Sequence, residues 1–291
     1  MDYQALSHNS LQSKLALGTA QFGLDYGITN SNGIVVKNEV HNILSLAKNY
    51  GIVTLDTAPD YGKSEKVLGE IGVNDFQVIT KTVSLEKGVN SVIKSFKKSL
   101  DYLEVERLYG LLIRAKDIQE KKIDYLYNQL TNLKQDKLIE KIGFSAYSPE
   151  QVDLLLAHFD FDLIQIPCNI FDERLTQSGK LGALKNKNIE VHARSIFLQG
   201  ILLDFENLPK YFETWEKQFS EYQKMVKASG NSLLQYSIKY ILNIPEIDKV
   251  IVGVNNAKQL KDIVQVAKSQ NGVKPYPIDD INLLNPSLWE E

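Results

Sequence analysis

Eight short apolar runs recur along the chain, separated by longer segments in which apolar and polar residues mix. The runs span residues 15–20, 53–58, 77–82, 108–114, 141–146, 163–169, 189–196 and 249–254. Each run is close to continuously apolar rather than alternating, which is typical of strands that are buried on both faces of a parallel sheet. We therefore expect eight buried parallel strands.

The segments between most of these runs have helical spacing. Apolar stripes with a period near 3.6 residues occur in 38–50, 88–103, 123–138, 149–159, 174–187 and 257–268. Ser148 precedes Pro149 and stands three residues before Gln151, which is typical of a capped helix start. Strand and helix units repeated in this way predict a closed (β/α)8 TIM barrel.

No linker-like or low-complexity stretch divides the chain, so we expect residues 1–291 to form a single barrel domain. Residues 197–248 hold more than one helical segment between the seventh and eighth runs, which predicts a helical insert. Residues 271–291 are expected to form an extended C-terminal tail. A two-domain α/β sheet is the alternative.

The composition is that of an ordinary globular protein, with 43% hydrophobic and 24% charged residues. A net charge of -3 without blocks of like charge argues against nucleic-acid partners and a polybasic membrane patch. No apolar run approaches the roughly 18 residues of a membrane span, and the first residues carry no signal pattern. The lone Cys168 cannot form an intramolecular disulfide and is expected in the core. These features predict a cytoplasmic protein; they do not indicate its oligomeric state.

Polar and ionisable residues stand at or near the carboxyl ends of the runs, where TIM barrels carry their active sites. They are Asp56, Lys81, Arg114, Ser145, Gln165, Arg194 and Ser195. Charges in such surroundings are costly unless they are paired or used in function. We therefore expect an active site here; a purely structural polar ring is the alternative.

Tyr61 follows the second run in the stretch "LDTAPDYG". A free phenol has a pKa of about 10, and a neighbouring cation lowers that value. Lys81 can supply the cation, and Asp56 can hold the lysine charged. Tyr61 is then a candidate general acid toward a carbonyl oxygen. The sequence shows no zinc-ligand spacing, so no metal is predicted, and no GxGxxG loop follows the first run.

The fragments "LGTAQFG", "LDTAPDYG", "VITKT", "IGFSAYS", "QIPCN" and "RSIFLQG" occur in the order and roughly the spacing of one known family. On these motifs the chain resembles an aldo-keto reductase over almost its whole length. The resemblance implies a barrel that binds NADP(H) across its C-terminal face and reduces a small aldehyde or ketone. It implies that Tyr61 is the acid and that Lys81 and Asp56 tune it.

The resemblance also implies a set of cofactor-binding residues. Ser145 and Gln165 match residues that hold the nicotinamide carboxamide, and Arg194 takes the place of an aromatic ring that stacks on the nicotinamide. The other implied cofactor-binding residues are Gly18 and Thr19 in the first run, Ser195, Phe197 and Gln199 along the pyrophosphate, and Gly253 and Gln259 near the adenosine.

Two departures from the family pattern affect the expected function. The family's catalytic histidine is replaced by Arg114, and neither His8, His41, His158 nor His192 obviously substitutes for it. An arginine can bind a carbonyl oxygen or clamp an anion, so a polar or anionic, sugar-like substrate is expected. Gly253 and Gln259 stand where NADP-binding members often place cations. NADP(H) is expected as the family default, and NAD(H) is the alternative.

Two other functions are compatible with these departures. The chain could be a nucleotide-binding barrel with little turnover that acts as a regulatory or partner-binding subunit. It could instead keep the cofactor and catalyse isomerisation or the reduction of a double bond. The intact set of Asp56, Tyr61 and Lys81 favours carbonyl reduction, because a pure binding module has no need of a tuned tyrosine.

Overall fold

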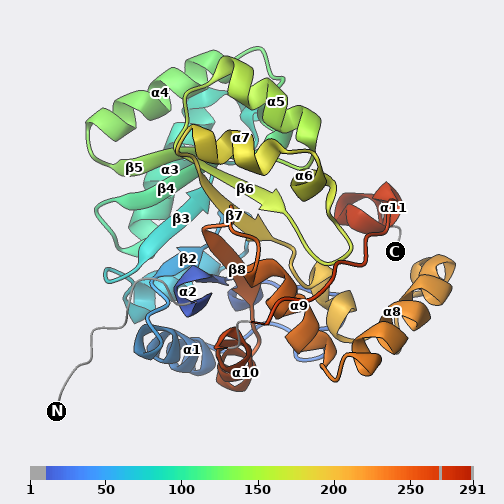
Figure 1. The fold of residues 1–291 in the computed structure, drawn as a ribbon. Coiled ribbons are helices and arrows are strands. Elements are labelled where there is room, and N and C mark those ends of the chain that lie inside the picture. Colours follow the sequence, from blue (N-terminus) through green and yellow to red (C-terminus); the bar gives the residue numbers. More distant parts are fainter. Residues whose placement is uncertain (1–10, 269–270, 290–291) are drawn as a thin grey trace.

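The computed structural model describes residues 11–268 and 271–289 of the chain, so His8 lies outside the described residues (Figure 1). Its strands pair in chain order, all parallel, and β8 closes on β1, which confirms the predicted (β/α)8 barrel. The strands are β1 (Leu15–Gly18), β2 (Thr54–Asp56), β3 (Gln77–Lys81), β4 (Leu108–Ile113), β5 (Ile139–Ser145), β6 (Leu163–Pro167), β7 (Glu190–Arg194) and β8 (Lys249–Gly253).

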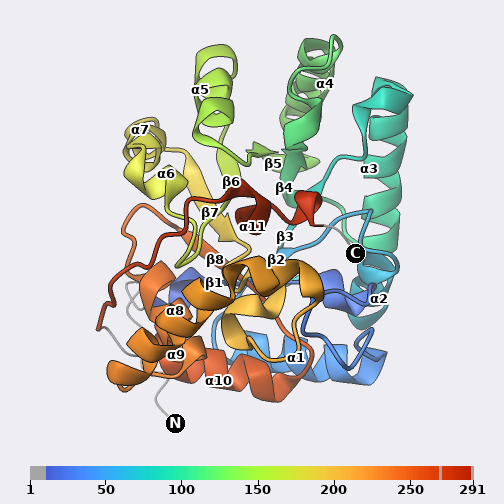
Figure 2. The same ribbon diagram turned by 90° about the vertical axis from the view of Figure 1, so that its right-hand side faces the viewer.

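Helices surround the barrel in both ribbon views (Figures 1 and 2). They are α1 (Lys37–Asn49), α2 (Ser64–Ile71), α3 (Val89–Leu103), α4 (Ile123–Gln135), α5 (Pro149–His158), α6 (Arg174–Gln177), α7 (Lys180–Asn186), α8 (Glu216–Ala228), α9 (Leu233–Leu242), α10 (Ala257–Ala267) and α11 (Ile281–Leu284). Short 3-10 helices are η1 (Leu11–Lys14), η2 (Ala20–Phe22), η3 (Leu85–Lys87), η4 (Ala115–Asp117), η5 (Leu198–Leu203), η6 (Lys210–Trp215) and η7 (Pro286–Leu288).

Apolar side chains of the predicted strands and helices pack on both faces of the barrel strands. Outside the barrel, the buried stripe of α1, which includes Val40 and Ile43, packs into the main core with the helix-facing strand residues. Inside it, Ile79, Leu112 and Leu163 form a separate cluster. Strands covered on both faces therefore appear in the sequence as unbroken apolar runs.

Two helical predictions differ from the structure. The expected helix over 174–187 is broken into α6 and α7 at Ser178 and Gly179, because Gly179 has the left-handed φ of 73°. Helix α2 was not predicted.

The start of α5 is capped by Ser148, whose Oγ accepts the Gln151 N–H at 3.4 Å. Gln151 Oε1 accepts the Tyr147 N–H rather than that of Ser148, so only half of the capping box forms.

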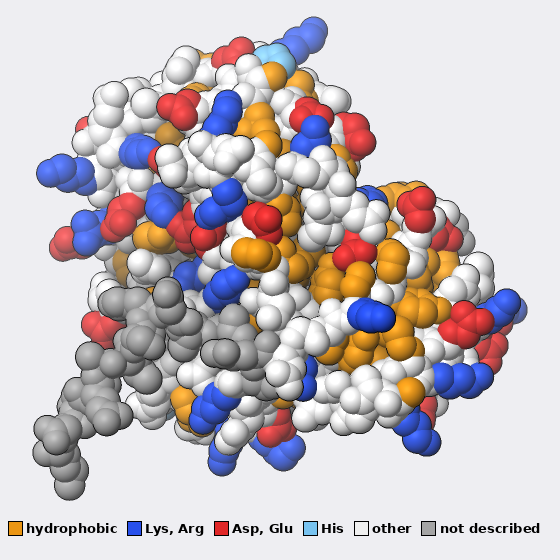
Figure 3. Space-filling model, in the orientation of Figure 1, with side chains coloured by type: hydrophobic (Ala, Val, Ile, Leu, Met, Phe, Trp, Pro, Cys, Tyr) orange, Lys and Arg blue, Asp and Glu red, His pale blue; other side chains and the backbone are white. Residues whose placement is uncertain are grey.

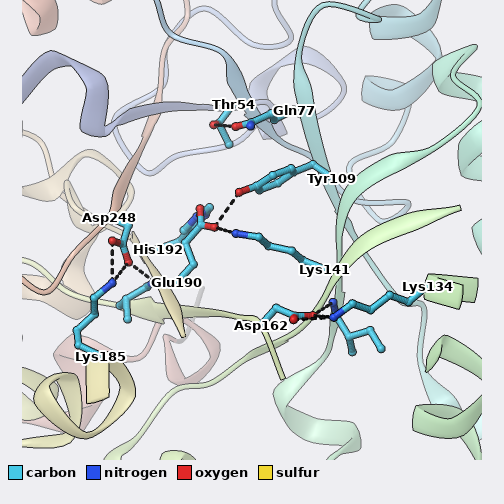
Figure 4. A network of polar contacts seen from close by, with 12 residues as sticks. Thr54, Gln77, Tyr109, Lys134, Lys141, Asp162, Lys185, Glu190, His192 and Asp248 are labelled. Carbon is cyan, nitrogen blue, oxygen red and sulfur yellow. Dashed lines mark hydrogen bonds and ion pairs between the residues drawn. The ribbon is translucent and has the colours of Figure 1, made fainter. Parts of the chain in front are cut away.

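The N-terminal mouth of the barrel holds a polar network (Figure 4). Glu190 accepts hydrogen bonds from the Tyr109 hydroxyl at 2.8 Å and from Lys141, and it lies 2.6 Å from His192 Nε2. His192 is fully buried, with its Nδ1 unpartnered. At this end of a TIM barrel, such residues contribute to stability rather than to catalysis.

The insert between β7 and β8 carries η5, η6, α8 and α9, and the C-terminal segment packs against it. Residues 271–280 have no regular structure, and α11 and η7 follow. Trp215 Nε1 donates to Asp280 Oδ2 at 3.0 Å, and the ring of Phe212 meets that of Trp289 at 5.0 Å between centroids. In Figure 2, α11 lies in front of the barrel strands, beside this insert.

Lys and Arg side chains intermix with Asp and Glu on the face shown in Figure 3, as the small net charge leads one to expect. Across residues 11–268 and 271–289, no helix combines the length and apolarity needed to cross a bilayer. Cys168 is buried as predicted, and burial raises the pKa of its thiol. The single-domain organisation stays a prediction.

Candidate active site

A cleft of about 1010 Å³ opens at the C-terminal ends of the strands. Every residue named as catalytic or cofactor-binding from the sequence lines it: Gly18, Thr19, Asp56, Tyr61, Lys81, Arg114, Ser145, Gln165, Arg194, Ser195, Phe197, Gln199, Gly253 and Gln259. The fold thus brings together residues that are far apart in the sequence.

Asp56 and Lys81 form a tight ion pair at the ends of β2 and β3. The Lys81 ammonium donates to Asp56 Oδ1 at 2.8 Å, to Oδ2 at 2.7 Å and to the Thr57 carbonyl at 3.0 Å. Burial lowers the lysine pKa, but the charges and hydrogen-bonding contacts of Asp56 and Tyr61 together outweigh burial and raise it. Lys81 is therefore a permanent cation in the floor of the cleft.

The backbone of the loop that carries Tyr61 is held by close contact with the loop after β1. A Cβ on Gly23 would lie 2.0 Å from the Tyr61 carbonyl oxygen, and one on Gly62 would lie 2.3 Å from the Gly23 carbonyl oxygen. Gly62 also has a left-handed φ of 60°. The two loops can approach this closely only because both positions are glycine, and the contact between them fixes the position of the Tyr61 phenol in the cleft.

Tyr61 lies beside the cation that was predicted for it. Lys81 Nζ is 5.0 Å from the centroid of the Tyr61 ring. Burial raises the pKa of Tyr61, while the Lys81 charge pulls that pKa down. Because burial is the larger effect, the net direction is upward, which corrects the expectation that the lysine leaves the pKa below its usual value. The phenol is thus protonated at neutral pH, as a proton donor must be.

Arg114, which follows β4, is paired rather than free. Its Nη1 donates to Asp60 Oδ2 at 2.9 Å. Asp60 is the neighbour of Tyr61, and 60% of its side chain is exposed. The arginine keeps other guanidinium N–H groups for a ligand, and both residues line the cleft.

Arg194, at the end of β7, lies over an aromatic ring. Its guanidinium carbon is 4.2 Å from the centroid of Tyr147, and its Nη1 donates to Ser195 Oγ at 3.1 Å. Its Nη2 is buried without a partner. Nearby, Gln165 Nε2 donates to Asp56 Oδ1 at 2.7 Å, which leaves Gln165 Oε1 as a buried, unpartnered acceptor. A buried donor and a buried acceptor are therefore available to a ligand.

The loop after β7 contains several left-handed residues, with φ of 58° at Ser195, 54° at Gln199 and 101° at Gly200. A Cβ on Gly200 would lie 1.9 Å from Thr29 Oγ1. The Ile28 N–H donates to the Gln199 carbonyl at 2.9 Å, so the loop after β1 packs against this one. Such backbone conformations persist where the surrounding structure enforces them, which is typical of binding loops.

Several residues that line the cleft were not predicted. Tyr26, Thr29 and Asn30 come from the loop after β1, Tyr147 from the loop after β5, Leu234 from α9, and Asn285 and Ser287 from the tail. Burial raises the pKa of Tyr26 to about 12, so this second phenol is neutral as well. Only its place in a loop directly after a barrel strand could have indicated Tyr26.

Comparison with known proteins matches residues 14–281 to the aldo/keto reductase family. An uncharacterised oxidoreductase of Bacillus subtilis (strain 168), YqkF, is 25% identical over 289 residues, covering 88% of this chain and 92% of that protein. The L-galactose dehydrogenase of Arabidopsis thaliana is 24% identical over 287 residues, covering 91% and 87%.

Solved structures show the same fold. The holo form of an aldo-keto reductase from Bacillus halodurans superposes with a TM-score of 0.73 at 20% identity, covering 90% of this chain and 88% of that one. The glycerol dehydrogenase of Gluconobacter oxydans gives a TM-score of 0.68 at 25% identity, covering 90% and 87%. The family match includes all eight strands and every cleft residue except Asn285 and Ser287. The chain therefore belongs to the aldo-keto reductase family, as its motifs predict, and is an NAD(P)H-dependent oxidoreductase that acts on carbonyl compounds.

Proposed function

We propose that this enzyme reduces an aldehyde or ketone that carries a polar or anionic group, with Tyr61 as the proton donor. The observation that carries the proposal is the convergence of three groups in one cleft. Lys81 is bound to Asp56 through both carboxylate oxygens and lies 5.0 Å from the Tyr61 ring. A buried phenol beside a fixed cation is suited to general-acid catalysis and has no evident structural use.

The residues of the cleft fit a nicotinamide dinucleotide. The unpartnered Gln165 Oε1 can accept from the carboxamide N–H, and the Ser145 hydroxyl at the end of the neighbouring strand can donate to its oxygen. Arg194 offers a flat guanidinium face to the nicotinamide ring and a free Nη2 to an anionic oxygen. Ser195, Phe197 and Gln199 then follow the pyrophosphate.

When bound, the reduced cofactor supplies the hydride that adds to the carbonyl carbon. The protein's part is to place the carbonyl oxygen near the Tyr61 hydroxyl and to donate that proton as negative charge develops. Lys81 then stabilises the phenolate, and Asp56 keeps the ammonium oriented and charged. Groups of this kind contribute roughly 10²–10⁴-fold to the rate.

Arg114 sets the expected substrate class. Its guanidinium is held by Asp60, which is largely exposed, so a substrate carboxylate or phosphate can share or replace that partner. Lys116, two residues on, lines the same wall of the cleft. A carbonyl compound with an anionic or hydroxyl-rich end should therefore bind beside Arg114 and Lys116 better than an apolar carbonyl compound does.

The test is steady-state oxidation of NADH and NADPH with matched anionic and neutral aldehydes. We expect turnover that Tyr61→Phe reduces by about 10²-fold or more, because the proton donor is lost. We expect Arg114→Met to raise KM for the anionic aldehyde about tenfold and to leave KM for the neutral one within about twofold.

Two results would contradict this assignment. Tight dinucleotide binding without turnover of any carbonyl compound would favour the regulatory or partner-binding subunit. Turnover that is restricted to conjugated double bonds and survives Tyr61→Phe would favour the altered reaction.

A further inference from the structure

We infer that the cleft selects NAD(H) over NADP(H), because its adenosine end is built to accept hydrogen bonds from ribose hydroxyls and to repel a 2′-phosphate. The inference rests on the proposed cofactor site and departs from the family default. It depends on how three neighbouring segments meet: the β8 end, the first turn of α10 and the side of α1.

The adenosine end of the cleft has no cationic lining. Among the residues that the structure describes, the cleft is lined there by Gly253, Asn255, Gln259, Asp262 and Ile263. The cations in its lining are Lys81, Arg114, Lys116 and Arg194, which come from the ends of β3, β4 and β7. Lys258 is 83% exposed and paired with Asp262 at 3.1 Å, and it does not line the cleft.

The N-terminus of α10 is already bound to a carboxylate. Glu39 of α1 accepts the Ala257 N–H at 2.7 Å, and this hydrogen bond lowers the pKa of Glu39, so the group is ionised. Asn256 Oδ1 caps the Gln259 N–H at 2.9 Å. The end of a helix that could attract a phosphate therefore holds a full negative charge from within the protein.

The groups that remain open to a ligand are largely acceptors. Asn255 donates through Nδ2 to Asn30 Oδ1 at 3.1 Å, which leaves Asn255 Oδ1 buried and unpartnered. Asp262 adds a carboxylate to the same end, where the exposed Lys258 pairs with it. A ribose 2′-hydroxyl can donate to such oxygens, as it does to the acidic residue of NAD-binding sites. A phosphate monoester has about -1.5 to -2 charges and needs several donors or a cation, whereas Gln259, whose Oε1 is used by the Asn255 N–H, offers it only an uncharged amide.

The test compares binding of NADH and NADPH to the full-length protein by quenching of its tryptophan fluorescence. We expect the Kd of NADH to be lower by about tenfold or more, since each carboxylate close to a phosphate costs about 1 kcal/mol in a solvated site and no cation lines this end. In the double variant Glu39→Gln and Asp262→Asn, the ratio of the two Kd values should move toward NADPH by about tenfold.

Asp75→Asn is the matched control, because Asp75 is an exposed carboxylate paired with Lys48 that does not line the cleft. It should leave the ratio unchanged. Since both Kd values are measured on one preparation, a loss of folded protein cancels in the ratio. Tighter binding of NADPH than of NADH, or an unmoved ratio in the double variant, would overturn the selectivity and leave carbonyl reduction standing. Binding of neither dinucleotide would end both proposals.

Discussion

At the scale of single residues, the ammonium of Lys81 explains much of the site. The ammonium donates to the two Asp56 oxygens and to the Thr57 carbonyl, so it holds the ends of two strands together. It also lies 5.0 Å from the centroid of the Tyr61 ring and acts on the phenol through its charge and a hydrogen-bonding contact. Asp56 and Tyr61 together keep the buried lysine protonated.

The pH dependence of carbonyl reduction should reflect this arrangement. Burial raises the pKa of Tyr61 above its ordinary value of about 10, so the acid stays protonated and kcat should be flat from neutral pH to about pH 10. It should fall only above that range. In Lys81→Met the lowering influence is lost, so the alkaline limb should move further up while kcat at pH 7 falls by about 10²-fold or more.

Steady-state kcat over a pH series with one aldehyde measures both effects, and Lys48→Met, which removes a surface lysine, is the control. A limb near pH 7 in the wild type would show that another group is the proton donor. A shift of the alkaline limb to lower pH in Lys81→Met would show the same.

Sequence and structure agree best where a motif is contiguous. Asp56 ends β2, Tyr61 follows five residues later in the next loop, and Lys81 ends β3, so their convergence follows once the barrel is predicted. Tyr26 and Asn30 could not be predicted in the same way. Their places depend on the backbone hydrogen bond of Ile28 with Gln199 and on the side-chain hydrogen bond of Asn30 with Asn255, which no local pattern specifies.

At the scale of elements, tertiary contacts decide what local periodicity leaves open. Helix α2 follows the Tyr61 loop and buries Ser64 and Glu65, polar residues that do not look like a core stripe. Their hydrogen bonds explain the burial: Glu65 accepts from Thr80 at 2.7 Å and from Ser99 at 3.0 Å. The break between α6 and α7 depends on one glycine with positive φ, which a helical pattern of apolar residues does not reveal.

The polar network at the N-terminal mouth should contribute to stability in a pH-dependent way. Contacts with His192 and Lys141 overcome burial and lower the pKa of Glu190 to about 2 from 4.5. Because this pKa is lower in the folded chain, the stabilisation is complete above about pH 4.5 and is lost as the pH falls toward 2. Glu190→Gln should therefore reduce the free energy of unfolding by about 3 kcal/mol at pH 7 and by roughly half of that at pH 3, where the folded carboxylate is still largely ionised.

Urea denaturation at the two pH values measures this difference. Glu140→Gln is the control, since Glu140 forms an exposed pair with Arg107 and should change stability by less than about 1 kcal/mol. An equal loss for Glu190→Gln at both pH values would mean that packing, and not charge, is what the residue provides.

At the scale of the whole molecule, the cleft is closed by segments that are distant in sequence. Asn285 and Ser287 reach it from the tail, and Leu234 from α9. The tail is fixed to the β7–β8 insert by the contacts of Trp215 with Asp280 and of Phe212 with Trp289. Residues 271–291 show no strand or helix periodicity, so the sequence could not say whether they cover the cleft. The place of the tail is set by contacts with residues far away in the sequence, such as the ring contact of Phe212 with Trp289.

Trp289→Ala tests this wall. The variant loses the ring contact with Phe212 and the hydrogen bond from Nε1 to the Leu283 carbonyl at 3.1 Å, so we expect η7, with Ser287 in it and Asn285 before it, to be freed. Such aromatic pairs are worth about 1 kcal/mol, which predicts a rise in substrate KM of about fivefold. The dinucleotide Kd should not change, because none of the proposed cofactor residues lies in the tail; they lie at the end of β1, on β5 to β8 with their loops, and in α10. Tyr125→Ala, an exposed aromatic of α4, is the control. An equal change in KM and in the dinucleotide Kd would show that the tail supports the whole cleft rather than its substrate side.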